Sequence, residues 1–150
     1  MANHSAAQVA EWFLAHNRNI ANDEGAEYIS NLKLQKLLYY AQGSFLAVTG
    51  APLFSDNIVA WQHGPVVEQI YHKYKSNGAQ GIEFTEDFDF SAFTTEENDL
   101  LTEVYDTFGQ YSAWKLRNMT HNEAPWKETY QNDIISRDKI KEYFQREYLA

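Results

Sequence analysis

Histidines are the side chains of this sequence best suited to chemistry, and two of them lie within the segment 61–74, WQHGPVVEQIYHKY. Imidazole nitrogens bind metal ions and transfer protons near neutral pH. Metal ligands on one helix usually sit three or four residues apart. His63 and His72 are nine residues apart with Gly64-Pro65 between them, which is a poor spacing for a shared ion.

His121-Asn122-Glu123 matches the letters of the H-x-E motif of zinc deaminases. Those enzymes also need a P-C-x-x-C partner motif, and this sequence has no cysteine. A site built by His63, His121 and Glu123 from distant parts of the chain stays open, and it would make the protein a metal-dependent hydrolase. Such histidines more often hold a turn through hydrogen bonds of their ring nitrogens.

Motifs for nucleophilic catalysis are missing. The sequence has no G-x-S-x-G elbow and no glycine-rich phosphate loop. The segment Ser112–Lys115 fits S-x-x-K by letter, but the partner motifs S-D-N and K-T-G are absent. Ser112 is better explained as a helix cap, so we predict no catalytic residue, no metal site, no cofactor and no enzyme activity.

The segment 61–74 is instead predicted to run as strand, tight turn and helix. The apolar, β-branched run Ile58–Trp61 is a strand candidate. Gly64 allows a sharp turn, and Pro65 suits the first position of a helix because it lacks an N–H. The strand could pair with Ile82–Phe84 as a small ribbon.

The clearest helical pattern is one apolar stripe at spacings of three and four. Its members are Leu34, Leu37, Leu38, Ala41, Phe45 and Val48. Ser30 or Asn31 would cap this helix and Gly50 would end it. Further helices are predicted from Ser5 to about residue 22, from a capping box at Thr94 to Gly109, from Ser112 to Met119 and after Ser136, with a short turn at Pro125. The fold class is therefore mainly α: a single compact helical domain over residues 1–150, with a long central helix and a small two-stranded β element.

Composition narrows the class of protein. The 150 residues, 44% of them hydrophobic, are enough for one core. The sequence contains no apolar run of the ~20 residues that cross a bilayer, no signal peptide and no cysteine. We therefore expect a cytoplasmic protein without a membrane partner.

The net charge of −9 is concentrated in one segment. Residues 83–106 contain nine acidic side chains and no Lys or Arg, while the rest of the chain is neutral. This distribution argues against direct nucleic-acid binding, which needs clustered cations. The acidic segment is either a solvated face or an attraction for a basic protein partner.

Several short runs then coincide in order and spacing. They are Leu34–Tyr40 followed by Gly43, Pro52–Phe54, Ala60-Trp61 with Gly64–Val67 and Tyr71, Ser112-Ala113 with Leu116, and Thr120-His121 with Glu123 and Pro125-Trp126. Together they resemble the Panacea-domain family, which includes SocA-like antitoxins and GepA-like phage-associated proteins. The resemblance covers the chain from about Ala6 to Trp126.

This resemblance implies a small helical antitoxin that binds and neutralises a cognate protein toxin of a toxin–antitoxin system, often in a phage, prophage or mobile element. An alternative that it also implies is a proteolytic adaptor, which delivers the bound toxin to an AAA+ protease. The family implies neither catalysis nor a cofactor.

Carried over to this sequence, the matching positions give two groups of site residues. The partner-binding candidates are Lys36, Tyr39, Tyr40, Trp61, His63, His121 and Trp126. The structural-turn residues are Gly64, Pro65 and Pro125.

These candidates have more than one interpretation. Lys36, off the leucine stripe, is either solvated or a contact for a toxin carboxylate. Tyr39 is expected to flank the core with its hydroxyl outward. Trp61 and Trp126 are core or edge aromatics, or else interface anchors. His121 either fixes the turn beside Pro125 or faces the partner.

Overall fold

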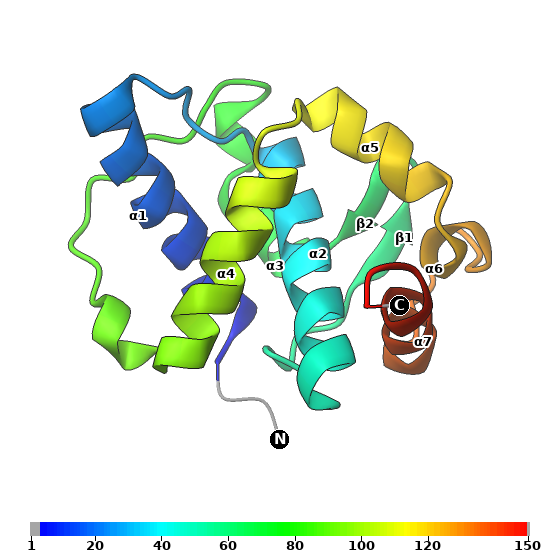
Figure 1. Cartoon of the computed structure of the whole chain (residues 1–150). Coiled ribbons are helices and arrows are strands. Elements are labelled where there is room, and N and C mark those ends of the chain that lie inside the picture. The colour runs from blue at the N-terminus through cyan, green and yellow to red at the C-terminus, as the bar shows by residue number, and fades with distance from the viewer. Residues whose placement is uncertain (1–3, 150) are drawn as a thin grey trace.

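The long helix α2, Asn31–Thr49, is the centre of the molecule. In the computed structural model, which describes residues 4–149, α2 packs against α1, α3, α4, α5, α7 and β2. Figure 1 shows α2 in cyan, with α1 and α4 to one side and α7 to the other. Residues 1–3 and 150 of the predicted domain lie outside the described residues.

The predicted mainly α fold is confirmed. The helices are α1 Ala6–Glu24, α2, α3 Glu68–Lys73, α4 Thr95–Phe108, α5 Ala113–His121, α6 Ala124–Lys127 and α7 Arg137–Glu147, with short 3₁₀ turns at Lys75–Asn77 and Phe90–Ala92. The strands β1, Val59–Trp61, and β2, Gly64–Val66, form one antiparallel pair.

Local side-chain chemistry sets the helix ends. Ser30 accepts a hydrogen bond from the Lys33 N–H and so caps α2, and Gly50 ends that helix with φ of 79°. Thr94 forms the predicted capping box at the start of α4. The caps predicted for α1, α5 and α7 are also present, at Ser5, Ser112 and Ser136.

The stripe of α2 is buried except at its last member. Val48 keeps 58% of its surface exposed, although an apolar stripe with this spacing is expected to be buried along its whole length. At this end of α2 the covering helices α4 and α7 leave an open groove, which Val48 lines together with Ala47 and Leu149.

Two predictions about the β element are wrong. The partner of β1 is β2, with Trp61 opposite Gly64 and Val59 opposite Val66. Pro65 therefore lies in a strand, and the helix predicted to begin there begins at Glu68. Ile82, the predicted strand partner, donates its N–H to the Ile29 carbonyl at 2.7 Å instead. A turn of two residues, 62 and 63, is enough to place β2 beside β1, whereas pairing with residue 82 would require a much longer connection.

A neighbouring segment pairs with one edge of this hairpin, and the other edge offers few backbone donors. On the β1 side, the 132–135 segment exchanges backbone hydrogen bonds with Ile58 and Ala60. On the β2 side, Pro65 has no N–H to offer. The hairpin is thus held in place by the rest of the fold. An isolated two-stranded ribbon would be only marginally stable. None of the helices in the described part of the chain is long and apolar enough to cross a membrane.

Candidate functional site

Lys36 is fully buried in α2, so the prediction of a solvated lysine is wrong. Its Nζ donates a hydrogen bond to the Pro65 carbonyl oxygen at 3.0 Å. Burial, and then the positive charge of Arg117, lower the pKa of Lys36 to about 7. The side chain contacts β2 from the interior of the fold and has no exposed surface that a partner could contact.

Other polar side chains of α2 bind backbone groups in the same way. Gln35 accepts a hydrogen bond from the Val67 N–H at 2.9 Å and donates to Asn31. Gln42 accepts from the Leu53 N–H and donates to the Phe54 carbonyl, both at 2.8 Å. The polar residues of the central helix therefore fix the segments that cross it.

Glu123 is a buried carboxylate held by three tyrosine hydroxyls. Tyr39 donates to its Oε1 at 2.9 Å, and Tyr40 and Tyr148 donate to its Oε2 at 2.9 and 2.7 Å. Burial raises the pKa of Glu123, and the three hydrogen bonds oppose that shift. The outward hydroxyl predicted for Tyr39 is therefore wrong: Tyr39 and Tyr40 are buried and join α2 to the start of α6.

The other sequence candidates meet at the hairpin turn. Trp126 Nε1 donates to the Trp61 carbonyl oxygen at 2.8 Å, and its ring stacks on His121 at 4.0 Å between centroids. The predicted turn residue Pro125 is buried in the first turn of α6. We call the face formed here the hairpin surface. Its residues are Trp61, His63, Trp114, Arg117, His121 and Trp126.

Arg117 organises the exposed part of the hairpin surface. Its Nε donates to His63 Nδ1 at 3.0 Å, and its guanidinium carbon lies 4.4 Å from the ring centre of Trp114. Trp114 is 55% exposed. Sequence reasoning missed Trp114 and Arg117 as site residues, because the only motif at this position, S-x-x-K, was explained by the cap at Ser112.

The hairpin surface carries a permanent positive charge at Arg117, on a protein with excess negative charge. Burial, together with the charge of Arg117, lowers the pKa of His121. The His121 Nε2 atom is buried and has no hydrogen-bond partner. The guanidinium of Arg117 would therefore attract a negatively charged group of a partner placed here.

A cavity of about 480 Å³ opens beside the hairpin turn. Aromatic and amide side chains make up much of its wall. Among its lining residues are Trp61, His63, Tyr71, Gln35, Asn31 and Asn132. Gln35 already has its amide bonded within the chain, whereas Gln62, His63, Lys75 and Gln131 line the cavity and are exposed, so a partner side chain could contact them.

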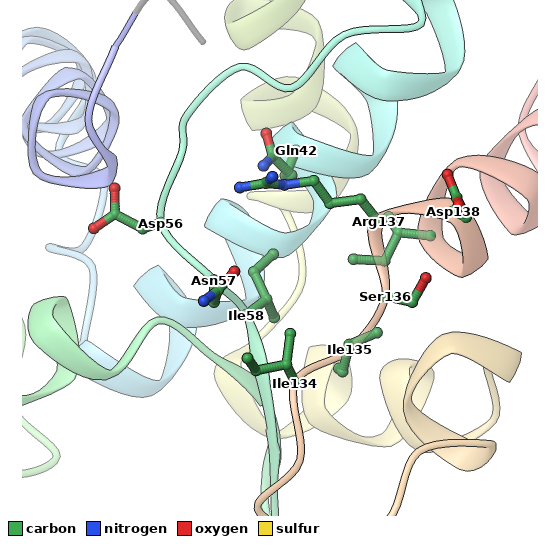
Figure 2. Close-up of a pocket in the computed structure, with 10 residues that line it drawn as sticks. Gln42, Asp56, Asn57, Ile58, Ile134, Ile135, Ser136, Arg137 and Asp138 are labelled. Atoms are coloured by element: carbon green, nitrogen blue, oxygen red, sulfur yellow. The ribbon is translucent and has the colours of Figure 1, made fainter. Parts of the chain in front are cut away.

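A second cavity, of about 260 Å³, lies between the segment before β1 and the start of α7. Figure 2 shows Ile58, Ile134 and Ile135 together at one end, with Arg137 extending across it. Arg137 donates to the Ser55 carbonyl at 2.5 Å, and Asp56 accepts from the Ala6 N–H at 2.9 Å. These charged groups have structural partners, so we give this cavity a role in packing.

The residues of the hydrolase alternative do not meet as a ligand set. Among the residues that the structure describes, no three His, Asp or Glu side chains are grouped to hold a metal ion. Both Glu123 oxygens accept from tyrosines, whereas His63 Nδ1 faces Arg117. Of the acidic residues in 83–106, Glu97 is buried and bonded to His4, and the other eight are exposed.

Comparison with known proteins adds the family. The model of the family described as antitoxin SocA-like, Panacea domain, matches residues 34–127, which run from α2 to α6 and include the whole hairpin surface. Antitoxin SocA of Caulobacter vibrioides (strain NA1000 / CB15N) is 48% identical over 54 residues, which are 36% of this chain and 29% of the relative. The alignment thus spans less than a third of that relative. No solved structure matches.

Proposed function

The chain belongs to the SocA-like antitoxin family defined by the Panacea domain, and from this premise we propose that it neutralises a protein toxin by binding it. The proposal assigns the contact to the hairpin surface. Binding, without conversion of a substrate, accounts for a site made of aromatic and cationic side chains.

The composition of the hairpin surface supports this assignment. Trp and Arg are the residues most enriched among interface hot spots, and Trp114 and Arg117 stand here against each other. The surface is also rigid, because Trp126 and Lys36 attach the hairpin to α6 and α2. A rigid surface loses little conformational entropy when a partner binds.

In the proposed mechanism the antitoxin covers the toxin in a stoichiometric complex. A stable complex buries on the order of 1,200–2,000 Å² in total, which is more than a few side chains provide, so the contact extends beyond the hairpin surface. The exposed acidic groups of residues 83–106 would speed the approach of a basic toxin.

Co-expression tests the proposal. Each open reading frame next to the gene is induced alone, and one that arrests growth is then induced together with this protein. We expect growth to recover and the two purified proteins to elute as one complex. If no neighbouring reading frame arrests growth, or if growth recovers without a complex, the proposal fails.

Matched variants locate the contact. Trp114→Ala combined with Arg117→Ala should abolish rescue, whereas Tyr130→Ala, which removes another strongly exposed aromatic ring, should leave it intact. Toxin half-life separates blocking from delivery to a protease. A half-life that is unchanged by the antitoxin supports blocking, and one that shortens only in cells with the AAA+ protease supports the adaptor mechanism.

A further inference from the structure

An open apolar groove of about 300 Å³ runs between α2, α4 and the end of α7. Figure 1 shows the three helices that form it, with the carboxyl-terminal half of α2 lying between α4 and α7. Most of its lining side chains are apolar. They include Val48, Leu100, Val104, Phe108, Tyr148 and Leu149.

The groove exposes apolar surface that the fold does not use. Val48 is 58%, Leu149 53% and Tyr148 43% exposed. These three side chains lie at one site instead of being scattered singly over the surface. Val48 also continues the stripe that the rest of α2 buries, so in the described structure this stripe has no cover at its last turn.

The residues of α2 at the floor of the groove have small side chains. Beneath the groove, Gly43 lets the Phe144 ring of α7 pack directly against α2, because a Cβ atom at Gly43 would lie 2.4 Å from that ring. Ser44 and Ala47 follow on the same side of α2 and line the groove. A helix from another protein could therefore approach α2 closely at Ser44 and Ala47.

One edge of the groove is acidic. Glu96, Asp99, Glu103 and Asp106 recur on α4 at spacings of three and four, which puts them on a single stripe. That stripe borders Leu100 and Thr107, two lining residues, and Glu103 itself lines the groove. The helix α4 has no Lys or Arg, so its field along this edge is negative throughout.

We propose that this groove binds a basic amphipathic helix of the partner, with its apolar face on Val48 and Leu149 and its Lys or Arg side chains along the acidic stripe of α4. The apolar floor and the negatively charged edge together fit such a helix, in the helix-in-groove mode of recognition. The inference rests on the proposed function in that the partner would be the toxin. It also adds a second contact to that of the hairpin surface.

A peptide probe tests the groove without any toxin. The probe is an 18-residue fluorescein-labelled helix of Leu and Lys in amphipathic order, and the comparison peptide has Glu in place of Lys. Fluorescence anisotropy at physiological ionic strength should detect binding of the Leu/Lys peptide and at least ~10-fold weaker binding of the Leu/Glu peptide.

Two pairs of substitutions then assign the binding to the groove. Val48→Ser with Leu149→Ser should weaken the Leu/Lys peptide ~10-fold while leaving the melting temperature unchanged, because both side chains are exposed. Asp99→Asn with Glu103→Gln should weaken it several-fold, whereas the matched pair Glu86→Gln with Asp87→Asn, on the loop before α4, should change it less than ~2-fold.

Equal binding of both peptides would overturn the proposal. Equal loss of affinity in the two acid-to-amide pairs would also overturn it, because that result would mean general charge attraction. Self-association of the protein that the serine pair abolishes would overturn it as well, because a second copy of the chain would then fill the groove. The outcome is independent of rescue: a protein that binds the Leu/Lys peptide through the groove but rescues no toxin refutes the proposed function alone.

Discussion

The Nζ atom of Lys36 lies 3.0 Å from the carbonyl oxygen of Pro65, and both residues are buried. This contact ties the central helix to the outer strand of the hairpin. It also places an ionisable group where water cannot solvate its charge, so the strength of the hairpin attachment is linked to pH.

Stability should therefore rise with pH above neutrality. In the unfolded chain Lys36 has a pKa of about 10.4, whereas burial lowers the pKa of Lys36 to about 7 in the folded protein. Between these values the unfolded state binds more protons. Stability is thus complete above the unfolded pKa and is lost as the pH falls toward the folded one.

From pH 7 to pH 9 we expect the free energy of unfolding to increase by ~2 kcal/mol from this group. Urea unfolding at pH 7, 8 and 9 measures it, and Lys36→Met should flatten the dependence. The tyrosines of the Glu123 cluster have raised pKa values and titrate above this range. Parallel curves for wild type and variant would contradict the assignment.

Gly64 should tolerate no side chain. Its φ is +113°, and a Cβ would lie 2.7 Å from Lys36 Cε and 2.8 Å from Thr120 Oγ1. Gly64→Ala should cost more than ~2 kcal/mol, from backbone strain and overpacking together. Gly25→Ala is the matched control, because Gly25 has φ of +75° with nothing within 4 Å, and it should cost about 1 kcal/mol. Chemical denaturation gives both values, and equal losses would mean that the close approach to Lys36 is not important.

The tyrosines around Glu123 should act as a unit. Glu123→Gln leaves one hydroxyl facing an amide N–H₂ group and should cost about 1–3 kcal/mol, whereas Tyr148→Phe removes one hydrogen bond and should cost about 1 kcal/mol. Because Tyr148 donates to Glu123 at 2.7 Å, the double variant should lose less than the sum. A strictly additive loss in denaturant titrations would show that the two side chains are uncoupled.

Helix ends and the core stripe could be predicted from sequence, because their signals are local. Ser30 and Gly50 bracket α2 through hydrogen bonds to neighbouring residues. The environment of Lys36 could not be predicted in this way. Helical periodicity separates a buried face from a solvated one, but α2 is covered on nearly every side and has no solvated face over most of its length. On such a helix Lys36, which stands between Gln35 and Leu37, is buried as they are.

The partners of buried polar groups were equally out of reach of sequence reasoning. Tyr39 and Glu123 are separated by 84 positions and meet only because α6 returns to α2. The matched runs of the sequence nevertheless lie together in the fold: the run at 34–40 contacts those at 60–67 and 120–126. The runs belong to the buried scaffold of the protein, whereas Trp114 and Arg117 on α5 are accessible at its surface.

The two tryptophans of the hairpin surface should separate binding from folding. Trp114 is largely exposed and makes its contacts with Arg117 and His63, so Trp114→Ala should change the free energy of unfolding by less than ~0.5 kcal/mol. If it anchors the toxin, the same substitution should weaken the complex by about 2 kcal/mol or more, roughly 30-fold in Kd.

Trp126→Phe should do the reverse. It keeps an aromatic ring over His121 but removes the indole N–H that bonds the Trp61 carbonyl at 2.8 Å. Because Trp61 is half-buried, loss of this hydrogen bond should cost about 1 kcal/mol of stability. It should weaken the affinity for the toxin only a few-fold. Thermal melts and calorimetric titration with the toxin that co-expression identifies measure both quantities. If Trp114→Ala destabilises the fold and spares the complex, the hairpin surface is part of the scaffold and the toxin binds elsewhere.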